Sequence, residues 1–353
     1  MARSFVIIGA GAIGCHVGGR LAAAGADVVL LARGDRRRVL ADHGLAVCDL
    51  NGGEVGVPRE RYRLAATAAE AAALAGPGPV LILATKGGAT AAAAAEADQA
   101  FPGGTPILSL QNGVDNGVRI RTAAPGLLPL AGMVPFNVTL DPDGGGRLVA
   151  RRTTSGTLHA EDHAATRAMA PEFERAGLPL RLVADMVPVQ WGKLLLNLNN
   201  PVNALSGLPL REQLLDRDYR RVLAMLQDEA LAVLKAAGIR PAQAGAAPPW
   251  LIPFVLCLPT WAFSRIAAGM LTIHPAARSS MADDVAAGRT TEIDDLCGAV
   301  VRLAGAHGMA APANAAMARL VAALRPGERV AGGDLLHRIG TAGAASGGPT
   351  AQP

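Results

Sequence analysis

The sequence predicts an α/β protein, with an N-terminal Rossmann-like, doubly wound sheet over residues 1–185 and an all-helical C-terminal domain over residues 186–325. Three observations predict this fold class. A glycine-rich turn of the dinucleotide-binding type joins a short apolar run to a helix at the start of the chain. Short apolar runs then alternate with alanine-rich stretches, and turn residues punctuate them, as in parallel α/β sheets. Beyond about residue 185, helical periodicity replaces the strand patterns.

The first β-α-β unit sets the pattern of the N-terminal domain. Residues 4–9 predict a buried strand, Ile13–Ala24 a helix that ends at Gly25, and Val28–Leu31 a second buried strand. Further helices are expected near 67–75 and 88–98, further strands at Val80–Ala84 and Pro106–Leu110, and a more β-like pattern from Leu130 to Val183.

The second domain is predicted to be helical throughout. The expected helices cover 189–200, 218–237, a proline-broken apolar stretch from 248, 276–306 and 312–324. Residues 340–353 are rich in Gly, Ala, Ser, Pro and Thr, and this composition is typical of a disordered tail.

Composition excludes several classes of partner. A net charge of +4 with arginines spread along the chain favours small anionic ligands weakly. Aromatic residues make up only 3% of the chain, which argues against a stacking platform for nucleic acid. The four cysteines form no Cys-x-x-Cys pair, as expected in a reducing cytoplasm, and no metal-site spacing is recognisable.

No membrane segment or secretion signal is expected either. The first residues do not form a signal peptide, because glycines interrupt the apolar run at once. The apolar stretch 248–271 is interrupted by three prolines and by Arg265, so we expect buried or lid-forming helix rather than a membrane span.

The glycine-rich turn is the predicted cofactor site, because it follows a strand and opens a helix. Gly9 permits the tight turn, Gly11 lets the backbone approach a pyrophosphate, and Gly14 lets helix and strand pack closely. The motif consists of Gly9, Ala10, Gly11, Ala12, Ile13 and Gly14.

Arg33 makes NADP(H) the expected cofactor. NAD-preferring sites place an acid at the exit of the second strand, where it accepts from the ribose 2′-hydroxyl. Arg33 stands at that exit instead and can bind a 2′-phosphate through two hydrogen bonds. Asp35 is either a displaced ribose acid or the cap of the helix that begins with the arginines.

Lys193 is the candidate proton donor. The chain has three lysines (Lys86, Lys193 and Lys235) among 33 basic residues, and a lysine, unlike an arginine, can give up a proton. Asn197 and Asn200 follow four and seven residues later, on one face of the expected helix, before Pro201 ends or kinks it. The alternatives are that the lysine bias is compositional, or that the polar stripe meets a carboxylate of another helix.

Two further motifs point to a family. Ser279-Ser280-Met281 and Arg289-Thr290-Thr291-Glu292-Ile293-Asp294 lie near the carboxy end. Together with Trp191–Asn200 and the glycine turn, they resemble the ketopantoate reductase (2-dehydropantoate 2-reductase) family over roughly residues 4–325. The resemblance implies NADP(H)-dependent reduction of a 2-oxo acid in pantothenate biosynthesis, and a homodimer.

The resemblance also implies roles for single residues. Lys193 matches the general acid, and Glu292 matches a glutamate that assists near cofactor and substrate. The implied substrate contacts are Asn197, Asn200 and Ser280, and the implied cofactor contacts are Lys86, Asn112 and, through its backbone, Asn137.

The match has departures. Asn200 follows Asn197 by three residues where the family often has four, Ala89 replaces a polar side chain of the cofactor loop, and segment 248–274 is longer and more apolar. On a straight helix Ser280 and Glu292 would lie about 120° apart, so both can face one ligand only if the chain bends, which we expect at Gly288.

Three functions therefore stay open. The first is NADPH-dependent reduction of ketopantoate or a close analogue, with Lys193 as general acid. The second is reduction of a different keto acid or imine. The third is a non-catalytic NADP(H)-binding sensor.

Overall fold

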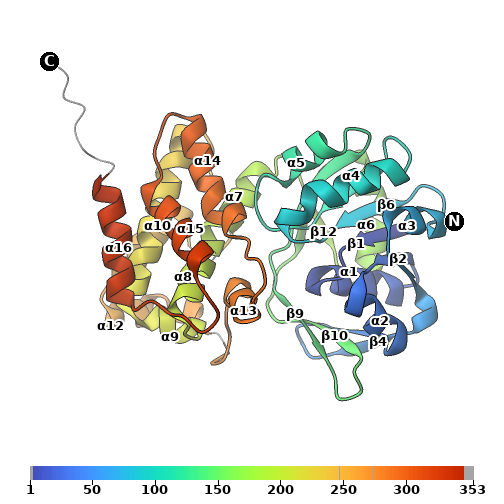
Figure 1. Cartoon of the computed structure of the whole chain (residues 1–353), viewed down its shortest axis with the longest axis horizontal. Helices are drawn as coiled ribbons and strands as arrows, with labels where there is room; N and C mark the ends of the chain where they lie inside the picture. Colours follow the sequence, from blue (N-terminus) through green and yellow to red (C-terminus); the bar gives the residue numbers. More distant parts are fainter. Residues whose placement is uncertain (1–2, 246, 273, 346–353) are drawn as a thin grey trace. The chain divides into compact units, whose positions relative to one another are not determined.

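The computed structural model describes residues 3–245, 247–272 and 274–345, and the chain divides into two compact units, Met1–Met186 and Val187–Pro353 (Figure 1). This division lies next to the boundary expected at about residue 185. The two units are described one after the other.

The N-terminal unit alternates strands and helices. Its strands are β1 (Ser4–Ile8), β2 (Asp27–Leu31), β3 (Leu45–Cys48), β4 (Glu54–Val57), β5 (Tyr62–Ala65), β6 (Val80–Leu83), β7 (Pro106–Ser109), β8 (Leu128–Met133), β9 (Val138–Pro142), β10 (Leu148–Arg152), β11 (Leu158–Glu161) and β12 (Leu180–Val183). Its α-helices are α1 (Ala12–Ala23), α2 (Gly34–Asp42), α3 (Ala68–Leu74), α4 (Thr90–Ala100), α5 (Asn116–Ala123) and α6 (Ala164–Arg175).

The main sheet has the strand order of a Rossmann fold. Its eight strands run β12-β11-β8-β7-β6-β1-β2-β5, and the six from β8 to β5 are parallel. The chain order reverses between β1 and β6, and ligands of such sheets bind at this switch point, outside the carboxyl ends of the strands. The Rossmann-like part of the predicted fold class is confirmed.

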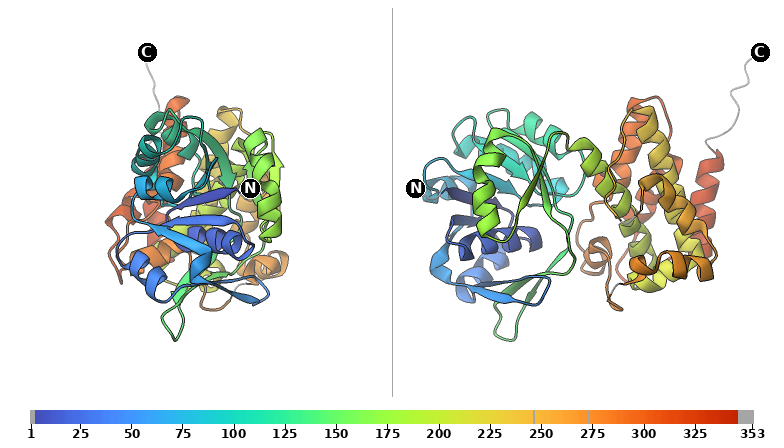
Figure 2. Two further views of the ribbon diagram at one scale, coloured as in Figure 1. Left: turned by 90° about the vertical axis from the view of Figure 1, so that its right-hand side faces the viewer. Right: turned by 180° about the vertical axis from the view of Figure 1, so that it is seen from behind.

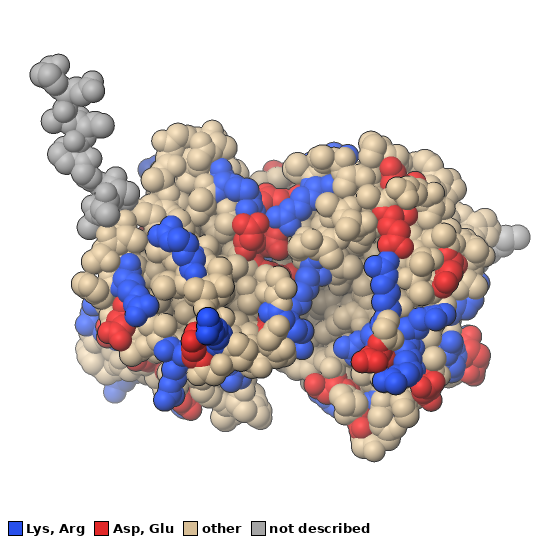
Figure 3. Space-filling view, in the orientation of Figure 1, with Lys and Arg blue, Asp and Glu red and all other residues tan. Residues whose placement is uncertain are grey.

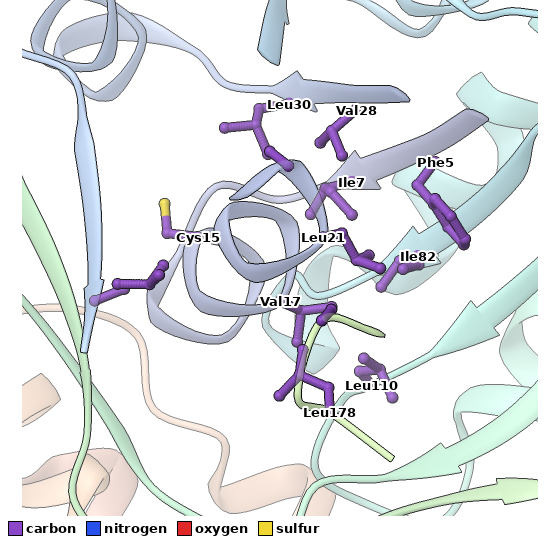
Figure 4. Packing of buried hydrophobic residues seen from close by; sticks show 14 of the residues in the cluster. Phe5, Ile7, Cys15, Val17, Leu21, Val28, Leu30, Ile82, Leu110 and Leu178 are labelled. Carbon is purple, nitrogen blue, oxygen red and sulfur yellow. The ribbon is translucent and has the colours of Figure 1, made fainter. Parts of the chain in front are cut away.

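Both faces of this sheet are buried, which explains the continuous apolar strands. In β1, Phe5 and Ile7 belong to the core beneath α1 and α6, whereas Val6 and Ile8 belong to the core beneath α3, α4 and α5. Figure 2 shows helices on both sides of the sheet, and Figure 4 shows Val17 and Leu21 of α1 packed among these strand residues.

A second, four-stranded sheet was not foreseen from the sequence. Its order is β4-β3-β10-β9, and β3 pairs in parallel with β10, about a hundred residues later in the chain. Helix α6 was also missed, because it lies within the 130–183 stretch whose pattern is more β-like.

The C-terminal unit is helical over its described residues, as expected. Its helices are α7 (Val187–Asn197), α8 (Asn199–Ser206), α9 (Leu210–Leu215), α10 (Arg217–Ala236), α11 (Ile252–Cys257), α12 (Thr260–Ile266), α13 (Ser280–Ala286), a π-helical turn (Asp294–Gly298), α14 (Ala299–Ala306), α15 (Pro312–Ala323) and α16 (Gly332–Ala345). The long helix α10 is its centre and contacts α8, α9, α11, α14, α15 and α16.

Three expectations for this unit are corrected. The helix expected over 276–306 is two helices and a π-helical turn, because the chain leaves α13 at Gly288 with φ +63°. The helix expected over 189–200 is broken at Leu198. The tail expected from 340 is wrong up to Ala345, which ends α16, and 346–353 lie outside the described residues.

Candidate active site

The glycine turn lies at the carboxyl edge of the sheet, where β1 meets the exit of β6. Gly9 has φ +107°, and a Cβ at this position would come within 2.8 Å of Thr85 Cγ2 and 2.9 Å of Thr85 N. A Cβ on Gly14 would lie 1.9 Å from the Gly9 carbonyl oxygen. Only glycine therefore lets the turn, helix α1 and the β6 exit approach one another this closely.

Gly11 differs from its two neighbours in the motif. A Cβ at Gly11 meets nothing within 4 Å, so the backbone there borders open space. Gly11 is also the N-cap of α1, with no side-chain cap and no acidic residue in the first turn. An uncapped helix N-terminus beside open space fits an anionic group such as a pyrophosphate.

A buried polar network fixes the two neighbouring loops. Gln111 Nε2 donates to Thr85 O (2.9 Å) and Thr90 Oγ1 (2.8 Å), and its Oε1 accepts from Ser109 Oγ (3.0 Å). Asn116 accepts from Thr90 Oγ1 and donates to Asn112 O at 2.7 Å. The loops after β6 and β7, which carry Lys86 and Asn112, are thereby held against each other.

Arg33 lies where the sequence places it, two residues after Leu31 at the end of β2, but it already has a partner. Its Nη2 donates to Glu96 Oε2 at 2.5 Å, and its Nε donates to Ala66 O at 3.0 Å. Arg33 and Glu96 line a cavity of about 250 Å³ beside Gly9 and Ala10. Sequence reasoning missed Glu96, Gln111 and Thr90; the available signal for Glu96 was a carboxylate within an otherwise alanine-rich helix.

Asp35 does not have one of the two roles left open for it, that of the helix cap. The N-cap of α2 is Arg33, with no side-chain cap, while Asp35 lies in the first helical turn and pairs with Arg38 at 3.0 Å. Asp35 is also absent from the residues that line the cavity. It stabilises the helix start as an acid near the positive end of the helix dipole.

Asn137 is exposed, and its backbone is occupied by the protein. Its N–H donates to Thr154 Oγ1 at 2.8 Å, and its carbonyl accepts from Thr153 N at 2.9 Å. The same carbonyl also accepts from Thr153 Oγ1 at 3.3 Å, so a cofactor contact through this backbone would have to displace one of these partners.

Lys193 lies on α7 and is half-buried. Burial lowers the pKa of its ammonium group, and within the described residues no carboxylate pairs with it. Of the expected alternative, in which the polar stripe meets a carboxylate of another helix, the part that concerns Lys193 is therefore not observed among the described residues. A desolvated lysine of lowered pKa gives up its proton more readily than an exposed one.

The asparagines that follow are divided between two helices. Asn197 ends α7, whereas Asn200 belongs to α8, so the single helix face expected for all three residues is wrong. Pro201 is the cause, since it lacks an N–H and its ring crowds the carbonyl four residues earlier, that of Asn197.

Helix α8 is tied to the start of α13. Ser279 N donates to Asn203 Oδ1 at 2.9 Å, and Ser279 Oγ donates to Asn200 O at 3.2 Å. Ser279 caps α13, which leaves Ser280 as the exposed first residue of that helix. Asn200 and Ser280, the two residues expected to contact substrate, therefore belong to helices that are joined by hydrogen bonds.

Glu292 follows the bend expected at Gly288. Helix α13 ends at Ala286 and the chain turns at Gly288, so the separation of about 120° that a straight helix would impose on Ser280 and Glu292 does not apply. The neighbouring acids form salt bridges, Asp284 with Arg289 (3.0 Å) and Asp294 with Arg302 (2.9 Å).

Surface charge and potential metal ligands do not point to a second site among the described residues. Basic and acidic side chains are interspersed on the face seen in Figure 3. The described residues contain no cluster of three His, Cys, Asp or Glu side chains suited to a metal ion. They also contain no helix that is long and apolar enough to span a bilayer.

A Rossmann unit with a glycine-rich turn at its switch point, joined to a helical unit that holds a desolvated lysine, fits a nicotinamide-dependent oxidoreductase, and the family matches make it one that acts on CH–OH groups. Family models agree: "Ketopantoate reductase PanE/ApbA" matches residues 5–161, and its "C terminal" model matches residues 185–325. The chain belongs to the ketopantoate reductase PanE/ApbA family.

Individual relatives are similar along most of the chain. A 2-dehydropantoate 2-reductase of Caulobacter vibrioides is 30% identical over 219 residues, 62% of this chain and 67% of that protein. One of Pyrococcus horikoshii is 27% identical over 319 residues, 90% of this chain and 96% of that protein. The crystal structure of a PanE/ApbA family ketopantoate reductase from Ralstonia eutropha JMP134 has a TM-score of 0.74 at 28% identity, covering 90% of this chain and 97% of its own.

Proposed function

We propose that this chain reduces a 2-oxo acid, ketopantoate to pantoate or a close analogue, with NADPH, and that Lys193 is the general acid. The observation that carries the proposal is Lys193 itself, a half-buried lysine without a carboxylate partner in the described chain, whose pKa is lowered by burial. Relatives named 2-dehydropantoate 2-reductase support the substrate class.

The residues present fit a dinucleotide. Open space at Gly11, the uncapped start of α1 and the Arg33 cavity would accept pyrophosphate and adenosine ribose, with Lys86 and Asn112 on the adjoining loops. When bound, the reduced nicotinamide supplies a hydride. Arg33 favours the 2′-phosphorylated form, because a guanidinium can bind a phosphate through two hydrogen bonds.

The helical unit supplies the proton and holds the substrate. The Lys193 ammonium donates a hydrogen bond to the keto oxygen, stabilises the alkoxide that forms there and passes it a proton. Asn197 and Asn200 hold the substrate hydroxyl or carboxylate, and Ser280 donates to the carboxylate. Glu292 orients Lys193 or anchors a hydroxyl.

Steady-state turnover tests the proposal. NADPH absorbance is followed with ketopantoate, with a panel of other branched 2-oxo acids and imines and with no acceptor, and NADH is run in parallel. Lys193→Ala should lower the rate by about 10²–10⁴, the usual range for a general acid. Undiminished turnover in that variant would exclude Lys193 as proton donor, and dinucleotide binding without oxidation across the panel would favour a sensor.

We also propose that the protein acts in the cytoplasm, in pantothenate biosynthesis, as a homodimer. The cysteines in the described chain are free thiols, as a reducing compartment maintains them. The apolar stretch noted from the sequence exposes four large side chains at 65–71%: Trp250, Phe254, Trp261 and Ile266. Large exposed apolar side chains, Trp and Phe above all, are enriched at protein interfaces, and we therefore place the dimer contact on this stretch.

The dimer can be tested by substitution, because hydrogen bonds to its main chain hold this stretch independently of its exposed side chains. Arg220 is fully buried and donates to the carbonyls of Leu214 (2.8 Å), Leu256 (3.0 Å) and Leu258 (3.0 Å). The stretch is thus anchored from below, so Trp250→Ser with Trp261→Ser should yield a folded monomer in sedimentation analysis. Val118→Ser, an exposed position of the other unit, is the control. A wild-type monomer would refute the dimer.

A further inference from the structure

The cavity next to the glycine turn has an unexpected acidic member. Its walls are mostly apolar or glycine, and three charged side chains line it: Arg33, Arg36 and Glu96. The two arginines suit a 2′-phosphate, but a carboxylate in the same cavity repels that group. Glu96 belongs to α4, so it does not stand at the strand exit where a ribose-binding acid is ordinarily sought.

Glu96 is held firmly by both of its oxygens. Oε1 accepts from the N–H of Ala68, the first residue of α3, at 2.9 Å, and Oε2 accepts from Arg33 Nη2 at 2.5 Å. Burial acts to raise the pKa of Glu96, but the hydrogen bonds from Ala68 and Arg33 and the guanidinium charge outweigh it, and the pKa is lowered. Glu96 is therefore an anion at neutral pH.

Arg33 is only partly engaged by this arrangement. Its Nε and Nη2 are occupied by Ala66 O and Glu96, while Nη1 makes no hydrogen bond within the described residues. The side chain of Arg33 is 62% exposed and that of Glu96 is 34% exposed, so both are accessible to a ligand. The pair offers a donor to a phosphate and an acceptor to a hydroxyl in one place.

We propose that Glu96 is a second determinant of cofactor specificity: its carboxylate accepts from the ribose 2′-hydroxyl of NAD(H) and disfavours the 2′-phosphate of NADP(H). The inference rests on the dinucleotide site of the proposed function. Glu96 takes the part that an acid at the end of β2 has in NAD-specific folds, but it does so from helix α4. The chain therefore accepts both cofactors, with Arg33 and Glu96 favouring opposite ones.

Calorimetric titration with NADP⁺ and NAD⁺, without substrate, tests this directly. The two ligands differ only in the 2′-phosphate, so the ratio of their Kd values isolates that group. Glu96→Gln keeps the shape and the acceptor for Ala68 while removing one charge, and it should shift the ratio about tenfold or more toward NADP⁺. Arg33→Met should shift the ratio in the opposite direction.

Asp98→Asn is the matched control. Asp98 lies on the same helix, carries the same charge and is not among the residues that line the cavity, so the ratio should stay within about twofold of wild type. A Glu96→Gln ratio equal to that of Asp98→Asn, or an unchanged ratio in Arg33→Met, would overturn the inference alone. Wild-type protein that binds neither ligand would overturn the dinucleotide site as well, whereas binding without turnover would affect only the proposed reaction.

Discussion

Gly192 immediately precedes Lys193 in α7 and lies against the backbone of another segment. The loop after α10 returns to this helix, where Ala242 N donates to Pro188 O at 2.8 Å. A Cβ at position 192 would come 2.1 Å from Ala242 O and 3.1 Å from Ala242 C, and neither atom belongs to a side chain that can rotate away. Gly192→Ala must therefore move the helix or the loop.

The size of that movement sets the expected effect. Ordinary contacts of a Cβ begin at about 3.4 Å, so the gap must open by about 1.3 Å. Misplacing a catalytic group by about 1 Å can cost on the order of 10² in rate. Overpacking costs roughly 1–3 kcal/mol, partly offset by about 1 kcal/mol because alanine favours the helix, so the melting temperature should fall only a few degrees.

Gly192→Ala is therefore expected to separate activity from stability. The assay compares kcat and melting temperature in Gly192→Ala and Gly245→Ala; in the control a Cβ would meet Leu196 of the same helix at an ordinary 3.6 Å. The control should retain kcat within about twofold. Wild-type kcat in Gly192→Ala would show that the position of α7 does not govern the reaction.

Three further predictions concern the lysine, the glycine turn and a buried histidine. Because burial lowers the pKa of Lys193 and only its ammonium form donates, the reduction rate should fall with rising pH through a pKa below the ordinary lysine value; a limb at the ordinary value would contradict this. Gly11→Ala should weaken NADP⁺ binding in calorimetry with little change in melting temperature, whereas Gly14→Ala should lower the melting temperature sharply; equal effects would refute the distinction. Burial lowers the pKa of His16 to about 4, so the unfolded chain takes up the proton first and about 3 kcal/mol of stability should be lost between pH 6.5 and 4. His16→Asn should remove that part of the slope in urea unfolding, and an unchanged slope would contradict it.

Local signals were enough to predict the elements that carry the cofactor turn. β1, α1 and β2 lie within one or two residues of the expected bounds, because apolar periodicity and glycines at the turns are written in consecutive residues. The sheet of β3, β4, β9 and β10 was missed for the opposite reason. Its central pairing joins β3 to β10 across the intervening Rossmann strands, and no short window records such a partner.

In the candidate site, too, features set by nearby residues could be predicted and features set by distant residues could not. The sequence itself shows which residue types surround Lys193 and Ser280. It also predicted the bend at Gly288, since two groups twelve residues apart cannot share one face of a straight helix. The break at Leu198 was misplaced because the consequence of Pro201 falls on the carbonyl four residues earlier. The contact between Glu96 and Arg33 could not be predicted, since it depends on how α4 packs in the folded domain and the two residues are far apart in the sequence.

The three lysines now differ in a way that composition could not reveal. Lys86 is exposed at the N-cap of a short 3₁₀ turn, and Lys235 lies in the last turn of α10, where any cation suits the helix dipole. An arginine could supply the charge in both places. Lys193, by contrast, is half-buried, burial lowers its pKa, and no carboxylate of the described residues pairs with it. An arginine there would stay charged and retain its proton, so Lys193→Arg should resemble Lys193→Ala in rate while preserving the charge of the helical unit.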